Sequence, residues 1–156
     1  MESGKDARAP GMPVIYSPWE TGKFVTEQWT SVTYHNTRPT YCNEEVKIEL
    51  PSSLKKDYHI VVQFFHVKCS QAAKKKVKPD ELLQELGFAV VPIVDRTGHL
   101  LEDQDEGVPV ILNYVNNYLD GGGEEALQYV DQGKKLLNYR TFVVSTIHCQ
   151  EENIKN

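Results

Sequence analysis

Long apolar runs are absent from this chain of 156 residues, and their absence excludes one class of protein. No stretch approaches the roughly 20 consecutive apolar residues that a membrane-spanning helix requires. The polar start of the chain, Met1–Asp6, also has no apolar centre of the kind that secretory signal peptides carry. These two features predict a soluble, cytoplasmic chain.

Cysteine is scarce as well. The three cysteines, Cys42, Cys69 and Cys149, are odd in number and show no Cys-x-x-Cys spacing. This pattern is typical of free thiols in a reducing compartment, whereas small secreted domains carry paired cysteines. We therefore expect no structural disulfide.

A net basic charge is also lacking. The formal net charge of −5 argues against a nucleic-acid partner, because a general nucleic-acid binder needs a broad basic face to displace phosphate counterions. The charges are unevenly spread, however: Lys74–Lys78 contains four lysines, whereas Leu101–Gly133 contains eight acidic residues and no Lys or Arg. Salt screens each cluster beyond about 8 to 10 Å, so an acidic domain can still present one cationic tip.

Catalytic and cofactor-binding motifs are missing. The chain contains no Gly-x-Ser-x-Gly, no P-loop and no Gly-x-Gly-x-x-Gly. The segment His66–Cys69 and the pair His148 and Cys149 offer zinc-type or nucleophilic side chains, but a separation of three residues on a strand sends side chains to opposite faces. No third group is positioned to orient a nucleophile. We expect no catalytic residue, no metal and no cofactor.

Strict alternation is what the sequence does contain. In Glu45–Leu50, the apolar residues Val46, Ile48 and Leu50 alternate with charged residues. This period of two residues is typical of an antiparallel strand with one face in water.

Six other segments are short, rich in β-branched and aromatic residues, and separated by Pro, Gly, Asn and Asp turns. Together they predict an all-β antiparallel sandwich. The expected strands are Val14–Ser17, Phe24–His35, Glu45–Leu50, Tyr58–Lys68, Leu86–Asp95, Val108–Asn113 and Lys135–Cys149. One helical turn is expected at Lys78–Glu85, where Pro79 occupies a first-turn position. Asn113–Gly133 contains three consecutive glycines and is expected to be a flexible acidic loop.

Most aromatic residues fall within or beside the expected strands, which predicts that they pack in the core or in turns. Trp19 follows Ser17-Pro18 and is the exception, because a Trp next to proline can sit exposed and contact a partner or a membrane interface. The aromatic residues expected to pack are Trp29, Tyr34, Tyr41, Phe64, Phe65 and Phe88.

Several sequence blocks, in this order, resemble one family along nearly the whole chain. The blocks are Val14–Tyr16 with the Pro-Trp turn after it, Tyr34–Pro39, Glu45–Pro51, Ile60–Cys69, Leu86–Leu100 and Leu136–Gln150. They resemble the C2-type domain, called DOCK-homology region 1, of the DOCK family of Rho-GTPase guanine nucleotide exchange factors, in its zizimin-like branch. The resemblance implies a C2-type antiparallel β-sandwich. Family members carry about two further strands on the N-terminal side, so it also implies a domain that lacks the first two strands.

The resemblance and the composition together suggest domain boundaries. Residues 1–13 form a polar leader, residues 14–150 the C2-type domain, and residues 151–156 the start of a linker or of a helix to the next domain.

In an up-and-down meander, successive connections alternate between the two ends of the sheet. This places Asn36–Pro39 and Cys69–Glu85 at one, basic end, and Ser52–Lys56 and Arg96–Gly107 at the other. The acidic loop Asn113–Gly133 would return to the basic end and compete for its lysines. Calcium needs several converging carboxylates, and Asp95, Asp103 and Asp105 lie in the loop at the acidic end, so we expect no calcium site.

The resemblance implies that the basic end binds phosphatidylinositol trisphosphate, as DOCK C2 domains do through basic loops. The expected lipid-binding residues are Lys74, Lys75, Lys76 and Lys78, with Arg38 and Lys68 in support. Lysine acts as a mobile point charge, so loop shape would decide the preference among phosphoinositides.

The resulting interpretation is a non-catalytic module that binds anionic phospholipid and recruits a DOCK-type exchange factor peripherally to the membrane. Its partners would be the lipid and other domains of the parent protein. The resemblance implies that nucleotide exchange on a Rho-family GTPase resides in a separate C-terminal domain of the parent. Two alternatives stay open: a protein-interaction or scaffold β-sandwich without lipid binding, and a truncated isoform or fragment. Exposed apolar residues on one sheet face without a charged tip would favour the interaction module.

Overall fold

The computed structural model describes residues 11–16, 25–26, 30, 41–68, 82–115, 118–121 and 126–144 of the chain. The chain consists of two compact units, Met1–Ser52 and Ser53–Asn156. Within the described ranges, no helix is long and apolar enough to cross a membrane.

The first unit contains a short antiparallel pair, β1 (Ile15–Tyr16) and β2 (Val25–Thr26). Ile48 forms an isolated bridge with Ile15 beside this pair. The expectation of a regular strand over Glu45–Leu50 is therefore wrong. Backbone bonds from Tyr16 to the Lys47 carbonyl and from Glu49 to the Val14 carbonyl flank the bridge, but β1 is too short to extend the ladder.

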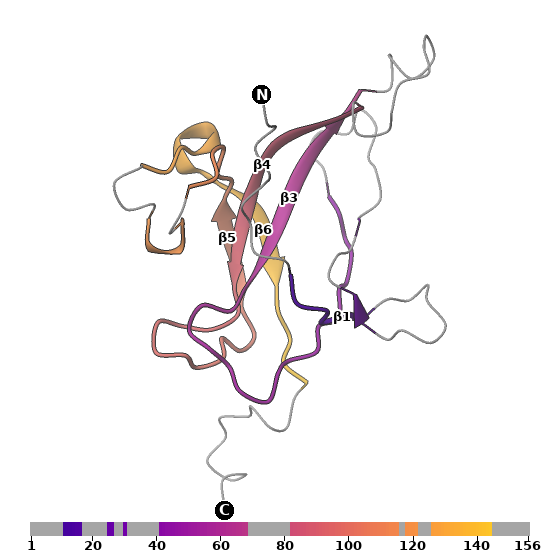
Figure 1. Cartoon of the computed structure of the whole chain (residues 1–156), viewed down its shortest axis with the longest axis vertical. Helices are drawn as coiled ribbons and strands as arrows, with labels where there is room; N and C mark the ends of the chain where they lie inside the picture. The colour runs from indigo at the N-terminus through magenta and orange to yellow at the C-terminus, as the bar shows by residue number, and fades with distance from the viewer. Residues whose placement is uncertain are drawn as a thin grey trace, which may run out of the picture. The chain divides into compact units, whose positions relative to one another are not determined.

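The centre of the second unit is a long hairpin (Figure 1). β3 (His59–Val67) pairs antiparallel with β4 (Leu83–Pro92), so that His59 lies opposite Pro92 and Val67 lies opposite Leu83. The strand β3 is rich in Val, Ile and Phe, which pack well on a pleated surface. Its bounds agree closely with the expected strand Tyr58–Lys68.

The strand β4 starts earlier than expected, at Leu83 instead of Leu86. The helical turn predicted over Lys78–Glu85 is wrong for its last residues, because Leu83 and Glu85 pair with Val67 and Phe65. Leu82 is helical, as predicted, and residues 78–81 lie outside the described residues. Cross-strand pairing overrides the weak local preference that Pro79 and the acidic residues suggest.

The remaining two strands form a separate two-stranded sheet, which an isolated bridge between Phe88 and Ile111 joins to β4. β5 (Asp105–Pro109) pairs antiparallel with β6 (Lys135–Arg140). The Phe88 N–H donates to the Ile111 carbonyl at 2.9 Å, and the Ile111 N–H donates to the Phe88 carbonyl at 2.7 Å. Ile111 also bridges to Tyr129, so the segment after β5 joins β4 to the chain that leads into β6.

Two strand boundaries differ from the expected ones for local reasons. The expected strand Val108–Asn113 is wrong in both bounds, because β5 begins at Asp105 and ends at Pro109, and of residues 110–113 only Ile111 forms isolated bridges. The register shifts between Val108 and Pro109, whose nitrogen cannot donate to the ladder. The strand β6 ends at Arg140, although the Thr141 N–H still donates to the Gln104 carbonyl at 2.8 Å. The rest of the expected strand, from residue 145 on, lies outside the described residues.

These strands confirm the predicted all-β antiparallel class. The helical residues in the described part are Leu82, directly before β4, and those of the short 3-10 helices η1 (Tyr118–Asp120) and η2 (Val130–Gly133). The buried apolar side chains of the described residues all belong to the second unit and come mainly from β4 and from the segments that follow it. They are Phe88, Ala89, Val91, Val94, Leu100, Val110, Ile111 and Val115.

The two ends of the hairpin carry the connections that the meander predicts. The loop between β3 and β4 leaves at Val67 and returns at Leu83, whereas the tight turn bridged by Val94 and Leu100 lies at the end of His59 and Pro92. The turn Asn36–Pro39 lies outside the described residues, so its place at the basic end stays a prediction.

The stretch Asn113–Gly133 is more ordered than expected in its described part. The His59 Nδ1 lies 2.6 Å from the Asp57 carbonyl, which can only accept, so Nε2 is the acceptor for the Tyr118 hydroxyl at 2.6 Å. Tyr118 and Tyr114 also pack their rings on Phe88. The start of the acidic stretch is therefore fixed against the middle of the sheet. Glu124 and Glu125 lie outside the described residues.

Candidate functional site

The tip of the β3–β4 hairpin is closed by a backbone hydrogen bond. The Lys68 N–H donates to the Leu82 carbonyl at 2.9 Å, directly beyond the last strand pair, Val67 and Leu83. The thirteen positions between them, residues 69–81, carry the lysine cluster in the sequence. The tip is thus the anchor from which the basic loop leaves and to which it returns.

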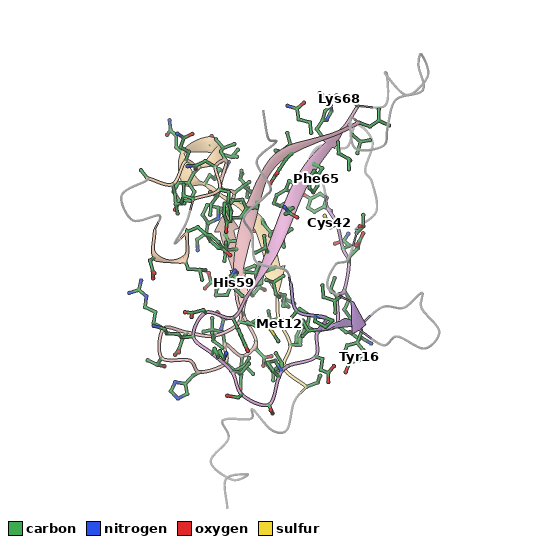
Figure 2. The ribbon with its side chains drawn as sticks, viewed as in Figure 1. Met12, Tyr16, Cys42, His59, Phe65 and Lys68 are labelled. Carbon is green, nitrogen blue, oxygen red and sulfur yellow. The ribbon has the colours of Figure 1, made fainter. Side chains whose placement is uncertain are left out.

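Only one of the expected lipid-binding residues lies in the described part of the chain. Lys68 directly follows the last residue of β3 at the hairpin tip, where Figure 2 shows it beyond Phe65, with His59 at the opposite end of β3. The structure therefore places Lys68 at the base of the basic loop and does not test the convergence of the set. The expected residues that lie outside the described ranges are Arg38, Lys74, Lys75, Lys76 and Lys78.

Near the tip, the hairpin carries a β-bulge. Phe64 lies opposite Gly87 and Phe65 lies opposite Glu85, so Leu86 has no partner on β3. A bulge bends its strand and increases the local twist, which re-aims the side chains around it. Gly87 has a φ of 143° here and lies close to the segment after β5. The distal part of the hairpin therefore departs from the regular sheet at this point.

Apolar side chains at the distal part of the hairpin are exposed, which the sequence interpretation missed. Phe65 is 45% exposed, and Leu83 and Leu86 are each 49% exposed. The expectation that Phe65 packs in the core is wrong. A signal was present, because adjacent residues on a strand face opposite ways, so Phe64 and Phe65 cannot both point to one core.

The opposite end of the sheet is held by a compact polar turn. The Asp95 carboxylate accepts hydrogen bonds from the backbone N–H of Thr97 at 2.8 Å and of His99 at 2.9 Å. The Thr97 hydroxyl donates to the same oxygen at 2.6 Å. These bonds, first that from the Thr97 side chain, then the backbone bond from His99, lower the pKa of Asp95 below its ordinary value.

Asp95 is therefore expected to make stability depend on pH in the acid range. Because its folded-state pKa is lowered, its contribution is present above the unfolded-state pKa of about 3.9 and is lost as the pH falls through the lower folded-state value. Asp95→Asn keeps an accepting oxygen but does not titrate. Thermal unfolding midpoints below about pH 4 should thus fall more steeply for the wild type than for the variant. Parallel curves for the two proteins would contradict this role.

The acidic residues beside this turn are engaged across the β5–β6 pair. Asp105 pairs with Arg140, and Glu106 lies 3.3 Å from the Lys135 ammonium. Partial burial raises the pKa of Tyr139, which lies opposite Glu106, and the charge of Glu106 raises it further. Across the described residues, no group of three or more His, Cys, Asp or Glu side chains is arranged to hold a metal ion.

The antiparallel strand pairs, with no long helix in the described part, are consistent with the β-sandwich of a C2-type domain. Comparison with known families agrees with this class. The family described as the C2 domain in Dock180 and Zizimin proteins matches residues 3–153 of the chain. The chain therefore belongs to the DOCK C2 family, which confirms the resemblance found in its sequence.

The chain matches a small part of much longer curated relatives. It is 29% identical over 155 residues to human dedicator of cytokinesis protein 9, covering 94% of this chain and 7% of that protein. It is 30% identical over 159 residues to human dedicator of cytokinesis protein 8, covering 97% of this chain and 7% of the relative. Mouse dedicator of cytokinesis protein 7 is 30% identical over 145 residues, covering 90% of this chain and 6% of the relative. The C2 domain of DOCK proteins is a regulatory and not a catalytic unit.

Proposed function

We propose that this chain is a phosphoinositide- and membrane-binding C2 module that recruits a DOCK-type exchange factor to anionic membrane. The observation that carries the proposal is the closed hairpin tip, where the Lys68 N–H bonds to the Leu82 carbonyl. Four lysines, Lys74, Lys75, Lys76 and Lys78, lie in the sequence between these two anchored residues. The basic residues therefore leave from one end of a well-paired hairpin.

Charge supplies most of the affinity in this proposal. Each lysine near an anionic leaflet is worth about 1 kcal/mol, so the four lysines contribute roughly 3 to 4 kcal/mol, or two to three decades in partitioning. Such binding is weak for an isolated domain. It becomes useful in a long parent protein, because a second linked contact raises the effective concentration of the first.

Loss of the lysine cluster should abolish most of the binding. Cosedimentation would compare vesicles that contain phosphatidylinositol trisphosphate with phosphatidylserine vesicles of matched charge. We expect the wild type to prefer the phosphoinositide. Changing Lys74, Lys75, Lys76 and Lys78 to Ala should lower its partitioning by roughly a hundredfold to a thousandfold, because the attraction scales with the number of charges.

A control of equal charge loss sharpens this test. Lys74→Ala with Lys75→Ala removes two charges from the loop, while Lys55→Ala with Lys56→Ala removes two exposed charges before β3, at the opposite end of the hairpin. The first pair should weaken binding by more than tenfold, and the second by less than about threefold. Equal effects of both pairs would indicate a non-specific response to net charge. Equal pelleting of the wild type and the quadruple variant, or none by either, would contradict lipid binding.

A second candidate is a protein-interaction module of the same parent. The segment after β6 favours it, because Phe142 is 71% exposed and Val144 is 96% exposed at the end remote from the hairpin tip. Exposed apolar residues gathered at one place mark contact surfaces. This candidate becomes the better one if the wild type fails to pellet with either kind of vesicle.

The wider role of the chain follows from its relatives and is part of the proposal. The chain corresponds to 6 to 7% of the length of these relatives. The resemblance to the DOCK family implies that nucleotide exchange on a Rho-family GTPase would reside in a separate C-terminal domain of the parent. The GTPase would be a partner only through the parent. The domain itself would span residues 14–150, act in the cytoplasm and bind the membrane peripherally.

A further inference from the structure

Exposed apolar residues adjoin the base of the basic loop. Phe65, Leu83 and Leu86 are each nearly half exposed, and they lie within a few residues of Lys68 and Leu82, where the loop is closed. In the middle of β4, by contrast, Phe88, Ala89 and Val91 are buried. Among the residues of β3 and β4, the exposed large apolar side chains are Val61, Phe65, Leu83 and Leu86, and the last three lie on the distal part of the hairpin, next to the lysines in sequence.

The pairing register places two of these residues on one face. Paired residues of an antiparallel ladder point to the same side, and alternate residues along a strand do so too. Val67 lies opposite Leu83, so Phe65 and Leu83 share a face, which also carries Glu85. Leu86 is the unpaired residue of the bulge. His66 and Gln84 lie opposite one another on the other face.

We infer that Phe65 and Leu83, with Leu86 beside them, form an apolar contact that enters the interfacial zone of an anionic membrane beneath the basic loop. This inference deepens the proposed function and rests on it. Charge complementarity favours a membrane as the partner of these apolar residues. They flank a lysine-rich loop in the sequence, and an anionic leaflet offers both negative charge and an apolar layer. Glu85 on the same face keeps the contact at the depth of the headgroups, since a carboxylate is costly in hydrocarbon.

The two parts of the contact respond differently to salt. Lysine attraction weakens as ionic strength rises, whereas apolar burial does not depend on screening. Removing the apolar residues should therefore lower the partition coefficient without changing its dependence on salt. Removing the lysines should lower both the partition coefficient and its dependence on salt.

The test measures partitioning of the full chain onto phosphatidylcholine vesicles with phosphatidylserine and phosphatidylinositol trisphosphate, at several salt concentrations. We expect Phe65→Ser with Leu83→Ser to lower the partition coefficient about tenfold and to keep the salt dependence of the wild type. Phe142→Ser removes an exposed apolar side chain at the remote end of the sheet and should change the coefficient by less than about twofold.

A gain-of-function variant guards against a folding artefact. Phe65→Trp should raise the partition coefficient by about threefold, because Trp favours the membrane interface, and an unfolded fraction cannot produce such a gain. If the double serine variant binds vesicles as the wild type does and the Trp variant shows no gain, the inferred apolar contact with the membrane is wrong. The lysine-dependent binding still stands in that case, and the exposed apolar residues would instead contact a protein. If neither the wild type nor the Trp variant binds vesicles, the inference and the proposed function both fail.

Discussion

Replacing Gly87 by Ala should lower the free energy of unfolding by about 3 to 4 kcal/mol. A Cβ atom at this position would lie 2.4 Å from the Ile111 carbonyl oxygen and 3.1 Å from the Val110 Cγ1 atom. The obstructing atom belongs to the backbone, so no side-chain rotation relieves the clash. The φ of 143° adds strain of about 1 to 3 kcal/mol for a residue with a side chain.

Gly87→Ala should also weaken the backbone hydrogen bonds between β4 and the segment after β5. The paired bonds between Phe88 and Ile111 join β4 to the segment after β5, and pushing Ile111 away weakens both, at about 0.5 to 1.5 kcal/mol each. Urea or thermal unfolding measures the sum, and we expect the midpoint temperature to fall by roughly 10 °C.

Gly98→Ala is the matched control for the steric part of this effect. Gly98 also has a positive φ, 89°, but no atom lies within 4 Å of the position of its Cβ. Its substitution should therefore cost only the backbone strain, about 1 kcal/mol. If the two variants lose the same stability, the approach of Ile111 to Gly87 does not constrain the fold.

The sequence predicted the regular part of the hairpin well, because the signal there is local. The β-branched and aromatic residues in His59–Phe64 favour a strand, and β3 includes this segment. The part near the tip was less predictable, because Leu83–Glu85 has little strand preference of its own and becomes β4 through its partners on β3. An isolated glycine in a strand pattern, Gly87, was the available signal for the bulge.

The alternating pattern predicted too long a strand at Glu45–Leu50, where the partner strand β1 is short. Glu45–Leu50 has a strict period of two, yet only Ile48 bridges, because a pattern reports which face is apolar and not how long the neighbouring strand is. Tyr118 is an opposite case, in which the sequence pattern predicts a loop but the residue packs against the sheet. Its neighbours are polar and glycine-rich, and its contact with His59 joins residues 59 positions apart, which local patterns cannot reveal.

The candidate site was predictable in its chemistry more than in its geometry. Four lysines in a row of five mark a cationic loop from sequence alone, and the register of β3 with β4 adds where that loop is anchored, at Lys68 and Leu82. The exposure of Phe65 required the structure, since Phe64 and Phe65 are equally apolar and only the sheet decides which of them faces outward.

Phe88 should be the most costly side chain of the sheet to truncate. It is only 2% exposed, it packs against the rings of Tyr114 and Tyr118, and its backbone joins β4 to Ile111. Phe88→Ala should therefore lower the free energy of unfolding by about 3 to 5 kcal/mol, through lost apolar burial and the cavity left behind. Urea unfolding measures this loss, and near-ultraviolet circular dichroism should report the loosened tyrosine rings.

Two companion variants separate the contributions around Phe88. Phe142→Ala removes the same side chain from an exposed position and should change stability by no more than about 0.5 kcal/mol. Tyr118→Phe keeps the ring that covers Phe88 but removes the hydroxyl bonded to His59, at a cost of about 1 kcal/mol. A loss below about 1 kcal/mol for Phe88→Ala would mean that the cluster is a surface contact, and that the folded-back acidic stretch does not cover the sheet.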